Sequence, residues 1–136
     1  MTQLITCLDK WTELLESGEP VDVIYLDFQK AFDSVPHQRL LVKLEAYGIT
    51  GQLKQWLADF LIGRRQRVVI GQDSSDWTSV KSGIPQGSVL GPVLFVIFIN
   101  DLPDALSSAS KIFADDTKLY RTVKEPRDNK LLQQDL

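Results

Sequence analysis

Apolar residues recur at helical spacing in several stretches of the chain, and each stretch ends at residues that stop helices. Gly18 and Pro20 end the first stretch, Gly48 ends the second and Gly63 ends the third, because glycine and proline interrupt helical backbone. A further helix is expected after Arg127. The helices that this spacing predicts cover residues 4–15, 36–47, 50–62 and about 91–106.

Strand-like segments alternate with these helices. Residues 21–26 have the pattern of a buried strand, which ends in Asp27. Two hairpins are predicted, each from a pair of β-prone runs on either side of turn residues: residues 67–70 with 77–80, and residues 111–113 with 117–120. This order predicts an α+β fold in which helices pack on one face of an antiparallel sheet.

Several side chains have a structural interpretation. The aromatic residues Trp56 and Phe60 lie on the apolar stripe of the third helix and are expected in the core. Asp33 is expected to cap the helix that Pro36 opens. His37 is expected on the first turn of that helix, without a catalytic role.

Composition favours a folded domain of 136 residues, since 43% of them are hydrophobic and 24% are charged. A single cysteine, Cys7, excludes an internal disulfide and is expected in the core. It favours a reducing intracellular location, in the cytoplasm or the nucleus. The longest apolar run, residues 89–99, is too short to span a bilayer, so no membrane association is expected.

Two adjacent carboxylates, Asp115 and Asp116, stand at the corner of the second hairpin. Like charges repel there, and tight turns prefer Asn or Gly, so the pair suggests a bound cation. If the strand that ends in Asp27 lies beside this hairpin, Asp27 faces the pair. Three carboxylates at one sheet edge suit a hard ion such as Mg²⁺.

A loop rich in glycine and proline lies between these acidic sites, in residues 82–92. Glycine lets backbone approach a ligand closely, and proline fixes a turn. Within this loop, Pro85 and Gly87 flank the amide side chain of Gln86. We therefore expect the loop to contact a ligand.

Four motifs in order along the chain carry a family resemblance. They are Leu26-Asp27-Phe28-Gln29-Lys30-Ala31-Phe32-Asp33-Ser34-Val35-Pro36-His37, Ile84-Pro85-Gln86-Gly87-Ser88, Asn100-Asp101-Leu102-Pro103 and Phe113-Ala114-Asp115-Asp116. Together they resemble reverse transcriptases of non-LTR (LINE-type) retrotransposons, over nearly the whole chain. The resemblance implies a reverse-transcriptase-like palm that acts as an RNA-directed DNA polymerase.

The same resemblance implies roles for individual residues. Asp27 and Asp115 would bind both of two Mg²⁺ ions, with Mn²⁺ as an alternative metal, and Asp116 would assist with one ion. The backbone carbonyl of Phe28 would add a ligand. The ions would ease ionisation of the primer 3′-hydroxyl and neutralise charge on the leaving pyrophosphate.

Phe32 and Gln86 would contact the incoming nucleotide. The ring of Phe32 would exclude a ribose 2′-hydroxyl by steric clash, with ordinary core packing as the alternative. Pro85, Gly87 and Phe113 would belong to loops near template and primer.

The resemblance also predicts that residues 1–136 are one partial domain, a palm core from a longer polymerase with most of the fingers and the thumb absent. The partners implied are an RNA template, a DNA primer, a dNTP and the missing segments. The net charge of −3 is unusual for a nucleic-acid enzyme and agrees with such an absence, so the isolated fragment is expected to be weak or inactive.

Three alternatives stay open from the sequence. One is a catalytically inactive retroelement remnant that at most binds RNA or a partner. The second is a group II intron-type maturase. An unrelated Mg²⁺ nuclease would share the acidic residues, but it would need neither the glycine-rich loop nor the aromatic residue at position 32.

Overall fold

The computed structural model describes residues 2–136, with side chains from residue 5 onward, as two compact units. The first unit joins the residues up to Phe28 with the segment from Asn100 to the end of the chain. The second unit comprises residues 29–99. The chain therefore passes from one unit to the other at two points, after Phe28 and after Ile99.

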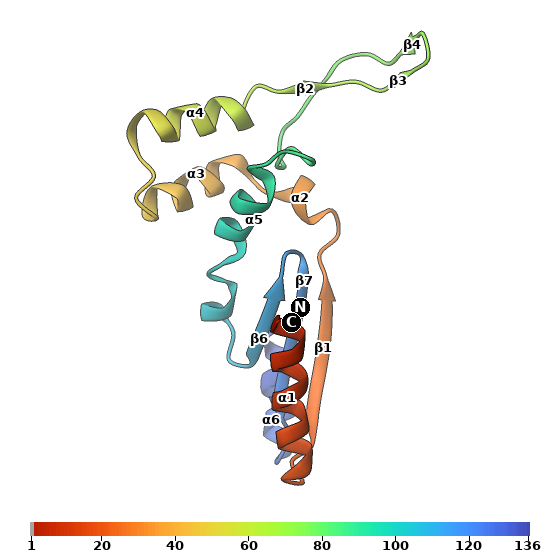
Figure 1. The fold of residues 1–136 in the computed structure, drawn as a ribbon, viewed down its shortest axis with the longest axis vertical. Coiled ribbons are helices and arrows are strands. Elements are labelled where there is room, and N and C mark those ends of the chain that lie inside the picture. The colour runs from red at the N-terminus through yellow and green to blue at the C-terminus, as the bar shows by residue number, and fades with distance from the viewer. Residues whose placement is uncertain (1) are drawn as a thin grey trace. The chain divides into compact units, whose positions relative to one another are not determined.

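The first unit is built on a three-stranded antiparallel sheet (Figure 1). Its central strand is β7 (Asp116–Thr122), which pairs with β1 (Val21–Asp27) on one side and with β6 (Ala109–Phe113) on the other. The predicted strand and the predicted acidic hairpin are therefore both confirmed, and they are hydrogen-bonded neighbours.

Burial alternates along the start of β7, as expected for a strand with one well-covered face. The side chains of Thr117 and Leu119 are 1% and 0% exposed, whereas Asp116 between the hairpin turn and Thr117 is exposed. A one-residue slip of this strand would exchange its buried and exposed faces. Burial of Leu119 therefore helps to fix the pairing register.

Helices α1 (Thr2–Glu16) and α6 (Pro126–Gln134) contact successive residues of β7. Trp11 of α1 packs edge-on against Tyr120, with ring centres 5.8 Å apart, and Asp128 of α6 pairs with Arg121 at 3.8 Å. Neighbouring strand residues point to opposite faces. The α+β class and antiparallel pairing are confirmed, while these two helices are divided between both faces of the strand rather than gathered on one.

Both ends of α6 are held by carboxylates. At its start, Asp128 accepts hydrogen bonds from the backbone N–H groups of Lys124 and Glu125, each at 3.0 Å. At its end, Asp135 accepts from the N–H groups of Ser107 and Ser108. Burial raises the pKa of Asp135, but the hydrogen bonds from Ser108 and Ser107 outweigh it and lower that pKa to about 2.

The second unit has a helical core made by α3 (His37–Ala46), α4 (Gly51–Leu61) and α5 (Gly91–Ile99), with the single-turn α2 (Ala31–Ser34) beside it. Gly48 adopts a φ of +82° after α3, and the next N–H donates to the carbonyl of Leu44 at 2.9 Å, which closes the helix as predicted. The buried core residues of this unit are Val35, Leu40, Leu41, Leu44, Leu57, Leu61, Ile84, Leu94 and Phe95.

The predicted hairpin between α4 and the glycine-rich loop is confirmed in outline. It consists of two short ladders, β2 (Arg65–Gln66) with β5 (Thr78–Ser79) and β3 (Val69–Ile70) with β4 (Asp73–Ser74). The turn is much tighter than the predicted six residues, because Gly71 adopts a φ of +61° and reverses the chain at once.

Two predictions about this region are wrong. The expected helix over residues 91–106 ends at Ile99, and a separate 3₁₀ turn, η1, covers Leu102–Ala105. A proline has no N–H to bond to the carbonyl four residues earlier, and its ring clashes with that carbonyl. Ile99 stands four residues before Pro103. Trp56 is 54% exposed rather than buried, although its ring stacks on Phe60.

Cys7 is buried, at 2% exposed, as expected. Within residues 2–136 we find no helix with the length and apolar character needed to cross a membrane.

Two leucines of α4 test the assignment of the core. Leu57 is 4% exposed and Leu53, one turn earlier, is 53% exposed. We expect Leu57→Ala to lower the free energy of unfolding by about 2 to 5 kcal/mol, because it leaves a cavity. Leu53→Ala has the same change in helix propensity and should lower it by less than about 1 kcal/mol. Urea unfolding followed by circular dichroism measures both, and equal losses would contradict the packing described.

Candidate functional site

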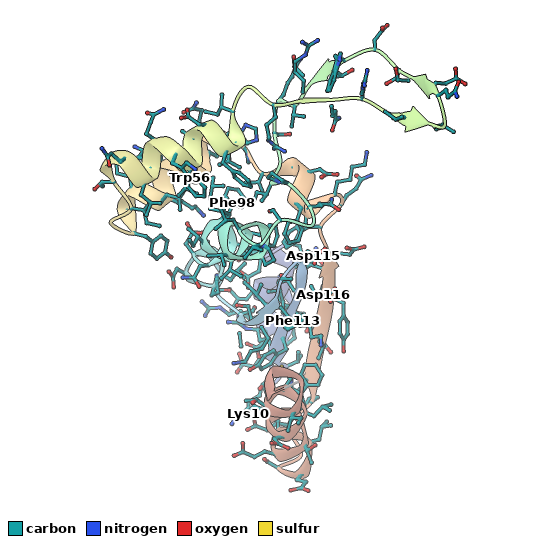
Figure 2. All side chains as sticks on the ribbon, turned by 45° about the horizontal axis from the view of Figure 1, so that its top comes forward. Lys10, Trp56, Phe98, Phe113, Asp115 and Asp116 are labelled. Carbon is teal, nitrogen blue, oxygen red and sulfur yellow. The ribbon has the colours of Figure 1, made fainter. Side chains whose placement is uncertain are left out.

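The acidic residues predicted to bind metal meet at one end of the sheet in the first unit. The register of β1 and β7 places Asp27 directly opposite Asp116. Asp115 precedes Asp116 in the two-residue turn that joins β6 to β7 (Figure 2). The other turn residue, Ala114, has a φ of +53°, a backbone conformation that L residues rarely adopt.

This arrangement sets like charges against each other. Residues directly opposite in an antiparallel pair have Cβ atoms about 4.5 to 5.5 Å apart, and like charges there are destabilising. Asp27 and Asp116 are both exposed. Among the described residues, none of the three carboxylates forms a hydrogen bond or an ion pair.

The donors at this edge fit a hard cation in kind, since carboxylate and carbonyl oxygens are the ligands that Mg²⁺ prefers. Phe28, whose carbonyl was predicted to add a ligand, directly follows Asp27. Phe113 pairs with Asp116 across the hairpin and is 67% exposed. Within residues 5–136, however, no three His, Cys, Asp or Glu side chains converge as a formed metal cluster.

The remaining predicted site residues lie in the second unit, where the glycine-rich loop is bound to α2. The N–H of Gly83 donates to the carbonyl of Val35 at 2.8 Å, and the N–H of Ile84 donates to the carbonyl of Phe32 at 2.9 Å. The Ser82 hydroxyl donates to the carbonyl of Asp33 at 2.8 Å. Three hydrogen bonds thus join the loop to the segment that follows Asp27 in sequence.

Gly83 is the point of closest approach between these segments. A Cβ atom added to it would lie 2.7 Å from the Cα of Asp33, and its φ is +93°. No other residue type fits such a contact without moving the backbone. The loop therefore needs glycine here for two independent reasons.

The carbonyl oxygen of Gly83 accepts two hydrogen bonds. One comes from Nε2 of His37 at 2.8 Å and the other from Nη2 of Arg64 at 2.6 Å. Because a carbonyl can only accept, Nε2 of His37 carries the hydrogen. Burial lowers the pKa of Arg64.

These contacts add two roles that the sequence did not indicate. His37 lies on the first turn of α3, as predicted, and it is also 6% exposed and bonded to the loop. Arg64, next to Arg65 in sequence, points inward to main-chain carbonyls. The one sequence signal for the contact of His37 was that the single histidine directly follows a proline. This signal did not specify a partner.

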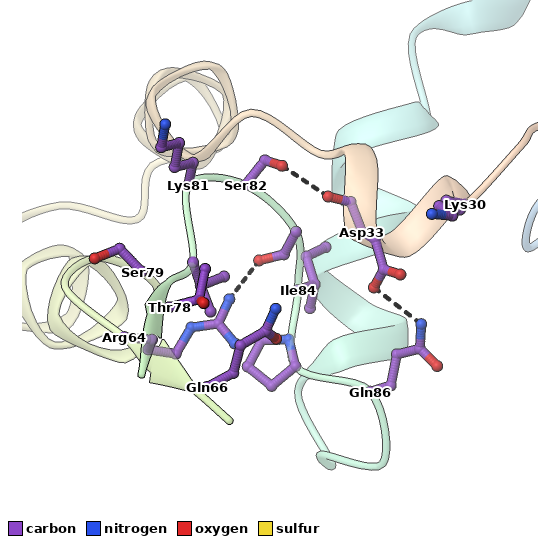
Figure 3. A pocket seen from close by; sticks show the side chains of 13 residues that line it. Lys30, Asp33, Arg64, Gln66, Thr78, Ser79, Lys81, Ser82, Ile84 and Gln86 are labelled. Atoms are coloured by element: carbon purple, nitrogen blue, oxygen red, sulfur yellow. Dashed lines mark hydrogen bonds between the residues drawn. The ribbon is translucent and has the colours of Figure 1, made fainter. Parts of the chain in front are cut away.

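Gln86 is held by a side chain from α2. Its Nε2 donates to Oδ1 of Asp33 at 3.0 Å (Figure 3). The prediction that Asp33 caps the helix starting after Pro36 is therefore wrong, since α3 has no side-chain cap and Asp33 points to the loop instead. Pro85 and Gly87 flank Gln86, and Gly87 adopts a φ of +75° in open space.

Phe32 lies beside this loop, on the same turn of helix as Asp33. Its ring stacks on Phe95 of α5, with centres 4.3 Å apart, and it remains partly exposed. The ring is thus fixed by the core while one part stays accessible. This contact agrees with either predicted role, core packing or nucleotide selection.

An open cavity of about 580 Å³ lies against this loop. Its charged and amide lining comes from α2, the hairpin and the loop (Figure 3). Those lining residues are Lys30, Asp33, Arg64, Gln66, Lys81 and Gln86.

Comparison with known proteins decides the family. Residues 6–135 match the sequence profile of the family described as "Reverse transcriptase (RNA-dependent DNA polymerase)". The chain belongs to the reverse transcriptase family. The match covers all four motifs from which the resemblance was predicted.

Individual relatives come from mobile elements. This reverse transcriptase chain is 40% identical over 92 residues (68% of the chain, 10% of the relative) to the RNA-directed DNA polymerase from mobile element jockey of Drosophila funebris. It is 30% identical over 115 residues (75% and 19%) to a Pol polyprotein from the type-1 retrotransposable element R2 of Popillia japonica. It is 33% identical over 119 residues (84% and 13%) to a probable RNA-directed DNA polymerase from transposon X-element of Drosophila melanogaster.

These relatives confirm the predicted resemblance to non-LTR retrotransposon reverse transcriptases. The chain spans between 10% and 19% of their length. The functions assigned to single residues stay predictions, because family membership does not test them one by one.

Two glycines of the loop test the importance of the close approach. Gly83→Ala should lower the free energy of unfolding by about 2 to 5 kcal/mol, since it adds a backbone clash to the strain of a positive φ. Gly87→Ala introduces the same positive-φ strain in open space and should lower it by only about 1 to 2 kcal/mol. Chemical denaturation measures the difference, and an equal loss would show that the loop moves away from Asp33 freely.

Proposed function

We propose that this chain forms the palm of an RNA-directed DNA polymerase, which transfers a nucleotide from a dNTP to the 3′-hydroxyl of a primer. The observation that carries the proposal is the strand register that sets Asp27 opposite Asp116, with Asp115 in the adjoining turn. The proposal is supported by membership of the reverse transcriptase family.

Asp27, Asp115 and Asp116, with the carbonyl of Phe28, would hold two Mg²⁺ ions, or Mn²⁺ in their place. The support is that exposed like charges face each other without a partner among the described residues, a repulsion that a cation would relieve. When bound, such ions favour ionisation of the attacking hydroxyl and neutralise charge on the leaving pyrophosphate.

The residues of the loop and α2 would serve nucleotide recognition. The bond from Gln86 to Asp33 fixes the direction of the amide, so its remaining donor and acceptor are presented in a defined orientation. Stacking on Phe95 fixes the ring of Phe32, and a rigid ring is what selection by steric clash needs. Pro85, Gly87 and Phe113 would contact template or primer.

The proposed partners are an RNA template, a DNA primer, a dNTP and further polymerase segments. The last of these follows from the relatives, of whose length this chain spans at most 19% in the matches given above. Segments outside the match would supply further contacts to the nucleic acid and the triphosphate. We therefore propose that the isolated chain extends a primer poorly or not at all.

Substitution of the opposed aspartates tests the metal site. In a protein that carries this chain with its flanking polymerase segments, Asp27→Asn or Asp115→Asn should reduce templated primer extension to background, because each removes a charged metal ligand. Asp22→Asn is the matched control, since Asp22 is an exposed aspartate on β1 whose side chain alternates to the other face.

Primer extension with an RNA template measures these variants, with and without a divalent chelator. Full activity of Asp27→Asn would contradict the proposed site. An inactive parent protein with intact RNA binding would instead identify a catalytically inactive remnant.

A second test concerns selection of the sugar. In the same longer protein, Phe32→Ala should raise the ratio of ribonucleotide to deoxynucleotide incorporation by about 10- to 100-fold, because only the clash is removed. Phe60→Ala is the control, since Phe60 is another partly buried ring packed against the same core. Single-nucleotide incorporation measures the ratio, and an equal change in both variants would assign Phe32 to the core alone.

A further inference from the structure

The hairpin of residues 64–81 carries two arginines against one tryptophan. The ladder pairs Arg65 with Ser79 and Gln66 with Thr78, so alternation places Arg65, Arg67 and Trp77 on the same face. The guanidinium carbon of Arg67 lies 4.7 Å from the centre of the Trp77 ring, and that of Arg65 lies 5.5 Å from it. We call these three residues the Arg–Trp face.

This face is not part of the core. Trp77 is 52% exposed, and it is absent from the hydrophobic cluster of the second unit and from the residues packed against it. Two cations hold the indole in place while half of its surface stays open. A large, rigid, accessible aromatic ring beside two cations is a surface suited to binding rather than to folding.

The charge of the hairpin differs in sign from that of the whole chain. Residues 64–81 contain four basic and two acidic side chains, whereas the chain carries a net charge of −3. Arg64 bonds inward to the carbonyls of Leu61 and Gly83. Arg65 and Arg67 are exposed, so they are the guanidinium groups available to an anionic partner.

Stacking and guanidinium groups together fit one class of partner. Unpaired bases stack on aromatic rings, and arginines beside the ring neutralise the adjacent phosphates. A duplex hides its base faces, so it fits less well. A membrane fits poorly because Asp73 pairs directly with Ile70 at the tip, which places a carboxylate among the apolar residues that would have to enter lipid.

We propose that the Arg–Trp face binds single-stranded nucleic acid, with an unpaired base on the exposed part of Trp77 and phosphates on Arg65 and Arg67. This surface would add a nucleic-acid contact to the proposed function. The contact is remote in sequence from the acidic residues, and binding there does not require those residues. Its binding is therefore separable from catalysis.

The test uses the 136-residue chain and a fluorescently labelled single-stranded RNA of about ten nucleotides. Fluorescence anisotropy gives the Kd, and Trp77→Ala should raise it about 5- to 150-fold through loss of stacking. Trp56→Ala is the matched control, because Trp56 is 54% exposed and stacks on Phe60. It should leave the Kd unchanged.

The arginines are tested by the dependence of binding on salt. The double variant Arg65→Gln, Arg67→Gln should reduce the slope of log K against log salt by about 1.4, since each phosphate contact on a single strand contributes about 0.7. The double variant Lys10→Gln, Lys54→Gln removes two positive charges elsewhere and should leave the slope unchanged.

Further variants separate binding from folding and from catalysis. Trp77→Phe keeps an aromatic ring and should retain most of the affinity, and circular dichroism checks that each variant is folded. Asp115→Asn should bind RNA like the parent, so a failure of the catalytic proposal is distinguishable from a failure of this one. The proposal is overturned if Trp77→Ala and Trp56→Ala bind alike, if duplex and single strand bind equally well, or if Trp77 is needed only for binding to anionic lipid vesicles.

Discussion

The second unit depends on the contact between Gly83 and the segment around Asp33. The Gly83 carbonyl joins His37 at the start of α3 to Arg64 after α4, through hydrogen bonds of 2.8 and 2.6 Å. Two buried or half-buried donors would be left without a partner if this oxygen moved, and each loss would destabilise the fold by about 1 to 3 kcal/mol. The loop is therefore fixed by the same contacts that hold the helices together, and Gln86 takes its position from them.

The first unit uses a different constraint, because its acidic edge is determined by burial elsewhere in the sheet. Burial of Thr117 and Leu119 fixes which face of β7 is covered. The pairing register then determines the face on which Asp116 lies and the residue that it opposes. The pairing that buries Leu119 is the pairing that opposes Asp27 to Asp116. The repulsion between these carboxylates is modest at an exposed edge, so the apolar side chains can impose an arrangement that the acids alone would avoid.

Sequence periodicity predicted the features that depend on neighbouring residues. It did not predict side-chain contacts with residues that are distant in sequence. The strand ending in Asp27 and the end of α3 at Gly48 were visible because strand pattern and helix termination are local signals. The partners of His37 and Asp33 lie 46 and 53 residues away, and no local pattern specifies such pairs. The prediction for Trp56 was wrong for a related reason. The apolar stripe of α4 is wider than the neighbouring helices can cover, so some of its residues stay exposed.

The distribution of charge shows why the net value of −3 is a poor guide to the partners of this chain. Any site that binds divalent ions through several carboxylates lowers the net charge, while phosphate recognition needs cations only at the contact itself. In this chain two arginines that are three residues apart make different contacts. Arg64 bonds to main-chain oxygens, whereas Arg67 lies over the exposed Trp77 ring. A net charge counts both kinds of arginine alike. The direction of each side chain separates a cation that stabilises the fold from one that can meet an anionic ligand.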